Sequence, residues 1–159
     1  MKLSGMMGAA LAVMMLVSVP ALAAGGKIME TFTTKYDFDT VKQNVQEALT
    51  GRGLVVNNVA HIGDMLERTG KDLGGARQVY VKAEAIEFCS ASVSRKMMEA
   101  DPHNIVFCPY IIAIYVLPET PDKTYVSFRK PTLVGSKQSR GALKEVETLL
   151  RDIIKEAIE

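Results

Sequence analysis

Two cysteines are the residues of this chain best suited to carry chemistry. Cys89 directly follows one predicted strand and Cys108 lies near the start of the next, with a short predicted helix between them. Antiparallel strands joined in this way bring the end of one beside the start of the other, so we expect the two thiols to meet at one end of a sheet. The sequence therefore predicts a two-cysteine site.

Three interpretations of this pair stay open. A disulfide would close a loop of about 20 residues and stabilise the fold by about 3 kcal/mol. Alternatively, Cys89 just ahead of a helix N-terminus would feel the helix dipole, which favours a thiolate for disulfide exchange or sulfur transfer. In the third interpretation, the thiols help to bind a ligand or a metal. The cysteines lack C-x-x-C spacing, which argues against thioredoxin-type oxidoreduction.

Few other side chains could complete a metal site around the cysteines. His103 lies in the turn that they enclose, and Met97 lies on the helix between them; His61 and Met98 are further candidates. Cys, His and Met are the ligands of soft copper sites, so a soft metal or non-covalent haem is one interpretation. The alternative is a solvated His103 and a Met97 packed in the core. No C-x-x-C-H motif is present, which excludes covalent haem. The cofactor is therefore unknown, and none is required.

Enzyme motifs are absent from the sequence. It contains neither G-x-S-x-G nor H-E-x-x-H, and the glycines at 70–75 lack the Lys-Ser/Thr ending of a phosphate loop. We therefore favour a role other than catalysis. A basic stretch around Gly135 is more typical of a solvated face than of an anion site. Its members are Arg129, Lys130, Lys137 and Arg140.

The N-terminus has the pattern of an export signal. Lys2 is followed by an uncharged run of 24 residues, and the apolar part ends at Pro20 before the small-x-small sequence Ala21-Leu22-Ala23. We predict a signal peptide over residues 1–23, a mature domain over 24–159 and a periplasmic location, with the membrane involved only before cleavage. The alternative is an uncleaved anchor, because such a run can just span a bilayer.

Composition indicates one globular domain. The 159 residues are 48% hydrophobic and 23% charged, which excludes intrinsic disorder. Nineteen basic against eighteen acidic side chains leave a formal charge of +1, which falls to zero once a signal containing Lys2 is removed. The chain also has no basic run, so it does not resemble a general nucleic-acid binder.

Exported proteins with two cysteines usually pair them.

The elements that position the cysteines follow from apolar periodicity. Strands are predicted over 28–36, 54–61, 78–88, 105–117 and 124–128. The first predicted helix begins at a cap, Asp37 or Asp39, and ends at Gly51. A short helix or turn is predicted over 62–69, and a helix over 90–101 with Ser90 or Ser92 as its cap. The last predicted helix spans 143–158. Short connections imply one α+β domain with a mainly antiparallel sheet.

Two of these elements carry specific expectations. The stretch 105–117 is apolar on both faces, so we expect a central strand covered on both sides by helix, partner subunit or ligand. In the closing helix, the charged residues lie opposite the apolar stripe, and we expect the helix to dock across the sheet. The charged residues are Lys144, Glu147, Arg151 and Lys155.

The order of these features resembles one known family, the domain-of-unknown-function 302 family, over residues 30–158. The matching motifs are Tyr36-Asp-Phe-Asp-Thr-Val, Ala48-Leu49, Gly53, Asp101-Pro102, Phe107-Cys108-Pro109-Tyr110, Val126-Ser-Phe-Arg-Lys-Pro131 and Leu133-Val134-Gly135. The resemblance implies a β-α-β(4)-α fold like that of TATA-binding protein, with helices packed on one face of the sheet, and it implies a homodimer. It implies no DNA binding and assigns no reaction.

Together these features predict an exported accessory protein that binds a small ligand or a redox cofactor, with Cys89 and Cys108 at its functional end. One alternative is a thiol-based periplasmic factor in sulfur or disulfide handling, with a redox or sulfur-metabolism partner. The other is a structural module with a stabilising disulfide. The two-faced apolar stretch 105–117 independently favours a homodimer.

Overall fold

The structure is a computed structural model that describes residues 28–75 and 77–159; the predicted signal peptide lies outside this part of the chain. The elements run in the order β1 (Met29–Thr34), α1 (Phe38–Gly51), β2 (Val55–Ala60), α2 (Ile62–Asp72), β3 (Lys82–Cys89), α3 (Ala91–Ala100), the 3₁₀ helix η1 (Pro102–Phe107), β4 (Tyr110–Val116), β5 (Thr124–Arg129) and α4 (Lys137–Ile158). This order is the predicted β-α-β(4)-α fold with helical insertions.

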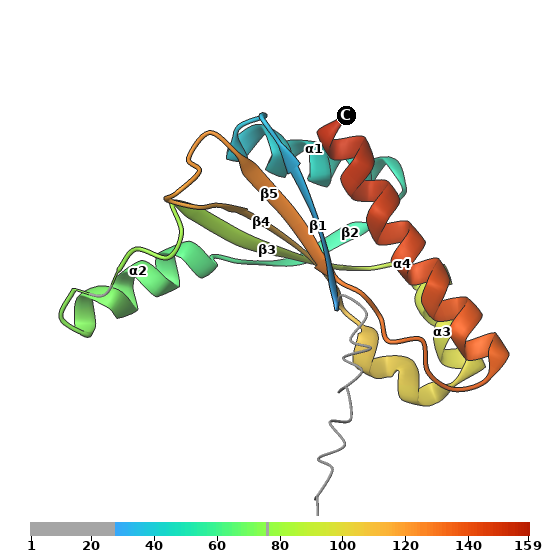
Figure 1. Cartoon of the computed structure of the whole chain (residues 1–159). Helices are drawn as coiled ribbons and strands as arrows, with labels where there is room; N and C mark the ends of the chain where they lie inside the picture. The colour runs from blue at the N-terminus through green and yellow to red at the C-terminus, as the bar shows by residue number, and fades with distance from the viewer. Residues whose placement is uncertain (1–27, 76) are drawn as a thin grey trace, which may run out of the picture.

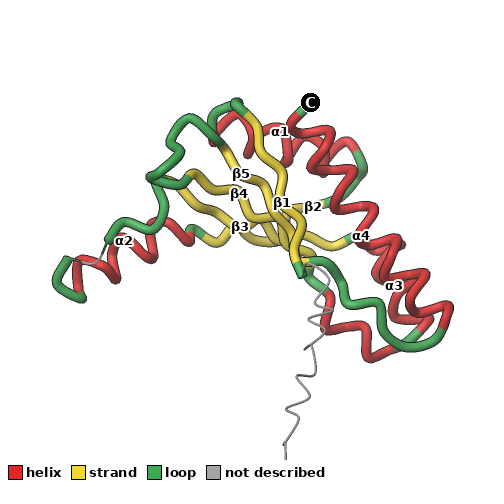
Figure 2. Tube along the Cα trace, in the orientation of Figure 1, coloured by secondary structure: helices red, strands yellow, loops and turns green. Residues whose placement is uncertain are grey.

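The strands form one five-stranded antiparallel sheet in the order β1-β5-β4-β3-β2. Helices α1 and α4 cover one face of this sheet, with α4 running across it, and α3 packs against α4 beyond the end of the sheet (Figures 1 and 2). The core lies between them, where inward-facing strand residues meet the apolar stripes of the helices. Its largest members include Val41, Leu49, Ile86, Phe88, Ile112, Ile114, Leu143 and Ile153. The α+β architecture predicted from the sequence is confirmed.

Local sequence signals set the starts of two helices. Asp37 caps α1, because its carboxylate accepts hydrogen bonds of 3.0 Å from the backbone N–H groups of Asp39 and Thr40. Ser90 caps α3 by accepting from the Val93 N–H at 3.4 Å. Both caps were among the alternatives predicted from the sequence.

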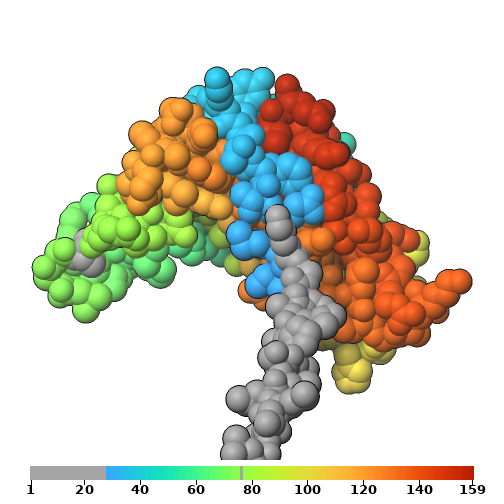
Figure 3. All heavy atoms as spheres, viewed as in Figure 1, coloured from blue at the N-terminus to red at the C-terminus, as the bar shows by residue number. Residues whose placement is uncertain are grey.

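Helix α2 stands apart from the other helices. It extends away from the sheet and buries none of its side chains (Figures 1 and 3). It meets the sheet at β3, where a Cβ added to Gly63 would lie 2.9 Å from the backbone nitrogen of Ala83. Glycine is therefore needed for this close approach. Within the described residues, no helix is long and apolar enough to cross a membrane.

The predicted strand over 105–117 is wrong in its first part. Its first three residues belong to η1, and β4 begins only at Tyr110, after a cis peptide bond between Cys108 and Pro109. Proline has no N–H to donate to a strand ladder, so the ladder begins after it. Val106, read as part of an apolar strand, is 78% exposed.

A buried amide holds η1 in place. The Asn104 side chain donates hydrogen bonds to the Met97 carbonyl oxygen at 3.0 Å and to Ser139 Oγ at 2.9 Å, which ties η1 to α3 and α4. The strand that follows is covered on its inner face only. On its outer face Ile111 is 44% exposed, so the described chain does not supply the cover expected on that side.

Candidate dithiol site and ligand pocket

The structure brings the two cysteines together, as the sequence predicted. The Sγ atoms of Cys89, at the end of β3, and Cys108, between η1 and β4, lie 2.9 Å apart. Both side chains are half-buried thiols. A disulfide bond measures about 2.05 Å, so the pair can be joined with little movement of the backbone.

A serine and a tyrosine complete the polar surroundings of the thiols. Ser94 Oγ on α3 lies 3.8 Å from Cys108 Sγ and 2.9 Å from the hydroxyl of Tyr110. The Tyr110 ring packs edge-on against Phe88, with ring centroids 5.8 Å apart. Sequence reasoning missed this serine and tyrosine; the only local signal was their nearness in sequence to the cysteines.

Cys89 is held in its protonated form. Burial raises the pKa of its thiol to about 11, and the hydrogen bond to Cys108 and the charge of a neighbouring Cys108 thiolate act in the same direction. Hydrogen bonds from the Asn57 side chain and the Tyr110 backbone only partly offset this. The helix dipole expected to favour a Cys89 thiolate is outweighed, because Ser90 occupies the N-cap of α3 and desolvation dominates.

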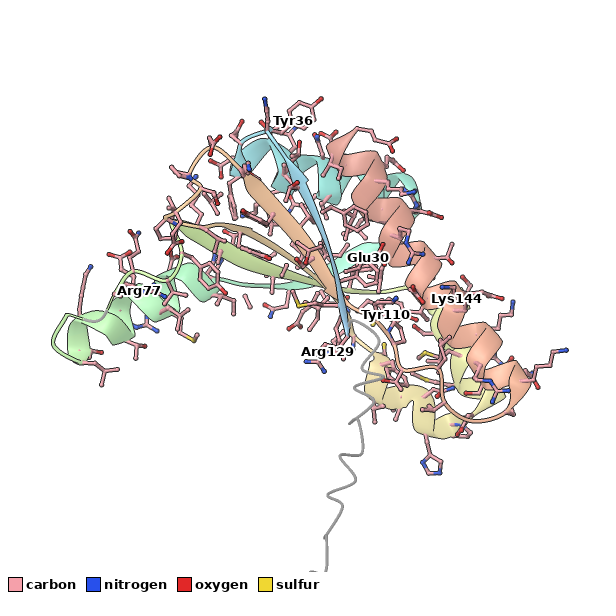
Figure 4. The ribbon with its side chains drawn as sticks, in the orientation of Figure 1. Glu30, Tyr36, Arg77, Tyr110, Arg129 and Lys144 are labelled. Atoms are coloured by element: carbon pink, nitrogen blue, oxygen red, sulfur yellow. The ribbon has the colours of Figure 1, made fainter. Side chains whose placement is uncertain are left out.

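A pocket opens beside Cys108. Its volume is about 690 Å³, within the range of about 300–1,000 Å³ typical of ligand sites. The starts of β1 and β4, the end of β5 and one side of α4 form its walls, which are mostly apolar. Principal lining residues are Met29, Phe107, Tyr110, Phe128, Val146 and Leu150. Figure 4 shows Tyr110 and Arg129, both lining residues, at the same end of the sheet.

The residues predicted as further metal ligands are not gathered around the cysteines. Met97 is fully buried in the core, and His103 is exposed on η1. His61 follows the end of β2 opposite to the end that pairs with Cys89, and its Nδ1 lies 3.2 Å from Glu84. In the described part of the chain, no three His, Cys, Asp or Glu residues are grouped so that they could hold a metal ion.

Comparison with known proteins identifies the family. A family model described as "Domain of unknown function DUF302" matches residues 30–159. The chain belongs to the DUF302 family. An uncharacterized conserved DUF302 protein from Bacillus stearothermophilus has a similar crystal structure, with a TM-score of 0.69 and 16% sequence identity over 83% of this chain and 99% of that chain. At this identity the likeness shows a shared fold alone. No curated protein matches the chain.

Behind the pocket, this DUF302 domain buries a carboxylate from the charged face of α4. Glu147 of α4 is only 3% exposed; it accepts hydrogen bonds from Lys144 at 2.9 Å and Arg151 at 2.6 Å. Lys130 Nζ lies 3.4 Å away. Arg151 also donates to both oxygens of Glu30, at 2.8 and 2.7 Å. Helical periodicity places Glu147 opposite the apolar stripe, and it is buried because β1 and the chain after β5 cover that side of α4.

Replacing Tyr110 with Phe in this DUF302 protein should lower the free energy of unfolding by about 1 kcal/mol. The change removes the hydroxyl that bonds Ser94 but keeps the ring against Phe88. Urea denaturation measures the loss, and Tyr36→Phe, at an exposed position, is the matched control. Equal stability of the two variants would contradict a stabilising role for the buried hydroxyl pair.

Proposed function

We propose that this protein binds a small, mostly apolar ligand in the pocket beside Cys108 and acts as an accessory protein rather than as an enzyme. The pocket itself is the observation behind this proposal. Its volume of about 690 Å³ and its aromatic and aliphatic walls suit a small organic molecule. The cysteine pair at its edge adds a redox-sensitive element to the binding site.

A second role, in thiol–disulfide exchange, is favoured by the 2.9 Å separation of the two sulfur atoms. In this exchange, a disulfide of a partner protein is the oxidant. One thiolate of the pair attacks it, the second thiolate resolves the mixed disulfide, and the partner leaves as a dithiol. The two protons lost by Cys89 and Cys108 are taken up by the partner's two sulfur atoms, and the Cys89–Cys108 bond forms as the partner's disulfide bond breaks. A periplasmic redox partner would supply such a disulfide.

Export to the periplasm is part of the same proposal and depends on the signal-like pattern of residues 1–23. There, an oxidising environment would favour the disulfide form of the pair. The mass of the mature protein isolated from its own cells tests this. A protein that keeps residues 1–23 would contradict export by cleavage.

We also propose that the protein is a homodimer joined through the outer face of its sheet. Tyr115 and Tyr125 stack there with ring centroids 5.2 Å apart, and Tyr80 packs edge-on against Tyr115 with ring centroids 5.7 Å apart. In the described chain this central part of the face has no helix over it. A second copy would remove these rings from water. Sedimentation that gives only monomers at micromolar concentration would overturn this assignment.

Narrowing the pocket should weaken ligand binding. Ile111→Trp adds bulk at a lining residue that is 44% exposed, and Val79→Trp makes a comparable change at a residue that is 45% exposed and outside the pocket. We expect the dissociation constant for the neutral dye Nile red to rise about tenfold, equivalent to about 1.4 kcal/mol, in the Ile111 variant only. Fluorescence titration measures it. Equal affinities in the two variants would contradict binding at this pocket.

A further inference from the structure

The pocket reaches the core where two neighbouring strands separate. Pairing of β4 with β5 ends at Ile112 and Phe128. Beyond that point, Ile111 pairs only with β3 and Arg129 pairs only with β1. The edges of β4 and β5 that face each other therefore carry no strand partner there, and residues of both faces of the sheet line the pocket.

The two ends of this opening differ in polarity. Side chains alternate across a strand, so Phe128 points toward the helices and Arg129 points to the outer face. The inner end is lined by Phe128 with the buried residues Val146 and Leu150 of α4. The outer mouth carries a guanidinium on Arg129. A ligand that fills both ends would therefore have an apolar body and a polar head.

The mouth of the pocket also has an excess of positive charge. Among the described residues, Arg129 has no ion-pair partner, whereas its neighbour Lys130 is paired with Glu147. Glu147 is already shared with two other cations, Lys144 and Arg151.

Other acidic groups do not offset this charge. Glu30 is bound by Arg151. On the outer face, Ile111 of β4 lies between Glu87 of β3 and Arg129 of β5. The described structure has no ion pair between Glu87 and Arg129. Arg129 is therefore the cation at the mouth that is left for a ligand.

Building on the proposed ligand pocket, we infer that its ligand is an apolar carboxylate, with the hydrocarbon body between β4, β5 and α4 and the carboxylate at Arg129. The planar guanidinium can donate two parallel hydrogen bonds to a carboxylate, which a neutral or cationic head group cannot accept in the same way. The apolar walls bind the body without selecting its head group, so selectivity among ligands of equal length depends on Arg129.

Three probes of equal chain length test this inference: decanoate, decanol and decylamine. Binding of each to the mature protein is measured by calorimetry and by displacement of Nile red. We expect decanoate to bind about tenfold more tightly than decanol, and decylamine to bind most weakly. Arg129→Gln should bring decanoate to the affinity of decanol, with both ligands measured by calorimetry on the same variant. Arg77→Gln, an exposed arginine outside the pocket, should leave the order of the probes unchanged.

The outcomes separate this inference from the proposal on which it rests. If decanoate binds no more tightly than decanol, or if its advantage persists in Arg129→Gln, the carboxylate assignment is overturned while apolar ligand binding stands. If neither Nile red nor any of the three probes binds to the wild-type protein, both the carboxylate assignment and the pocket proposal are overturned.

Discussion

Replacing Glu147 with Gln is expected to lower the free energy of unfolding by about 2–3 kcal/mol. The variant keeps the size of the side chain but leaves Arg151 and Lys144 beside a neutral amide in a nearly buried position. Removing one partner from a buried ion cluster lowers the free energy of unfolding by about 3–5 kcal/mol. Because Lys144 is half exposed and screened by solvent, the expected loss for this cluster is smaller.

A matched control lies on the same helix. Glu145 pairs with Lys96 across a solvated surface, with Nζ–Oε1 at 2.6 Å. Glu145→Gln is expected to change the free energy of unfolding by no more than about 0.5 kcal/mol, because exposed ion pairs contribute little. Urea denaturation of both variants makes the comparison. An equal loss of unfolding free energy in Glu145→Gln and Glu147→Gln would show that burial of the Glu147 carboxylate has no energetic consequence.

The same carboxylate should make stability depend on pH. Burial by itself would raise the pKa of Glu147, but hydrogen bonds from Lys144 and Arg151 and the charges of Lys144 and Lys130 outweigh burial and lower the pKa to about 2. A carboxyl with a lowered pKa in the folded state stabilises the fold above its ordinary pKa of 4.5, and this contribution is lost as the pH falls from 4.5 to about 2.

In this window the wild-type protein should therefore lose more stability than Glu147→Gln, whose side chain does not titrate. Denaturation curves collected between pH 6 and pH 2 measure the difference. Because the pKa of Glu30 is also lowered, chiefly by its hydrogen bond from Arg151, some pH dependence remains in the variant. Parallel curves for the two proteins would contradict the assignment to Glu147.

Oxidation of the cysteine pair is the second change with a large expected effect. Joining Cys89 to Cys108 closes a loop of about 20 residues, which should stabilise the folded state by about 3 kcal/mol and raise the melting temperature by about 10 °C. Calorimetry with and without reductant measures the shift, and intact mass confirms oxidation through the loss of two hydrogen atoms.

Serine variants provide the controls for this prediction. Cys89→Ser and Cys108→Ser should each melt at the same temperature with and without reductant. In Cys108→Ser, burial still holds the pKa of Cys89 above its ordinary value, so alkylation of the remaining thiol at pH 8 should be slow. A wild-type protein that stays reduced with oxidised glutathione would overturn the exchange role and leave the pocket proposal standing.

Local and topological signals were sufficient for much of this protein. The cap at Asp37 and the apolar stripe of α4 depend on residues close in sequence, so their patterns predicted both helices, although α4 begins at Lys137, six residues before the predicted start. The meeting of Cys89 with Cys108 was also predictable, because the connection between β3 and β4 is short and the two strands are antiparallel.

Tertiary structure alone decided the binding and charge features of the site. The opening between β4 and β5 depends on where their pairing stops, which no local pattern records. Glu147 is buried because Lys130 and the Glu30–Arg151 ion pair cover it. Glu30 and Arg151 are 121 positions apart in the sequence. Periodicity describes one helix face at a time and contains no information about what covers its edges. The sequence by itself therefore determined most of the elements and the cysteine pair, and long-range packing determined the pocket, its cation and the buried carboxylate behind it.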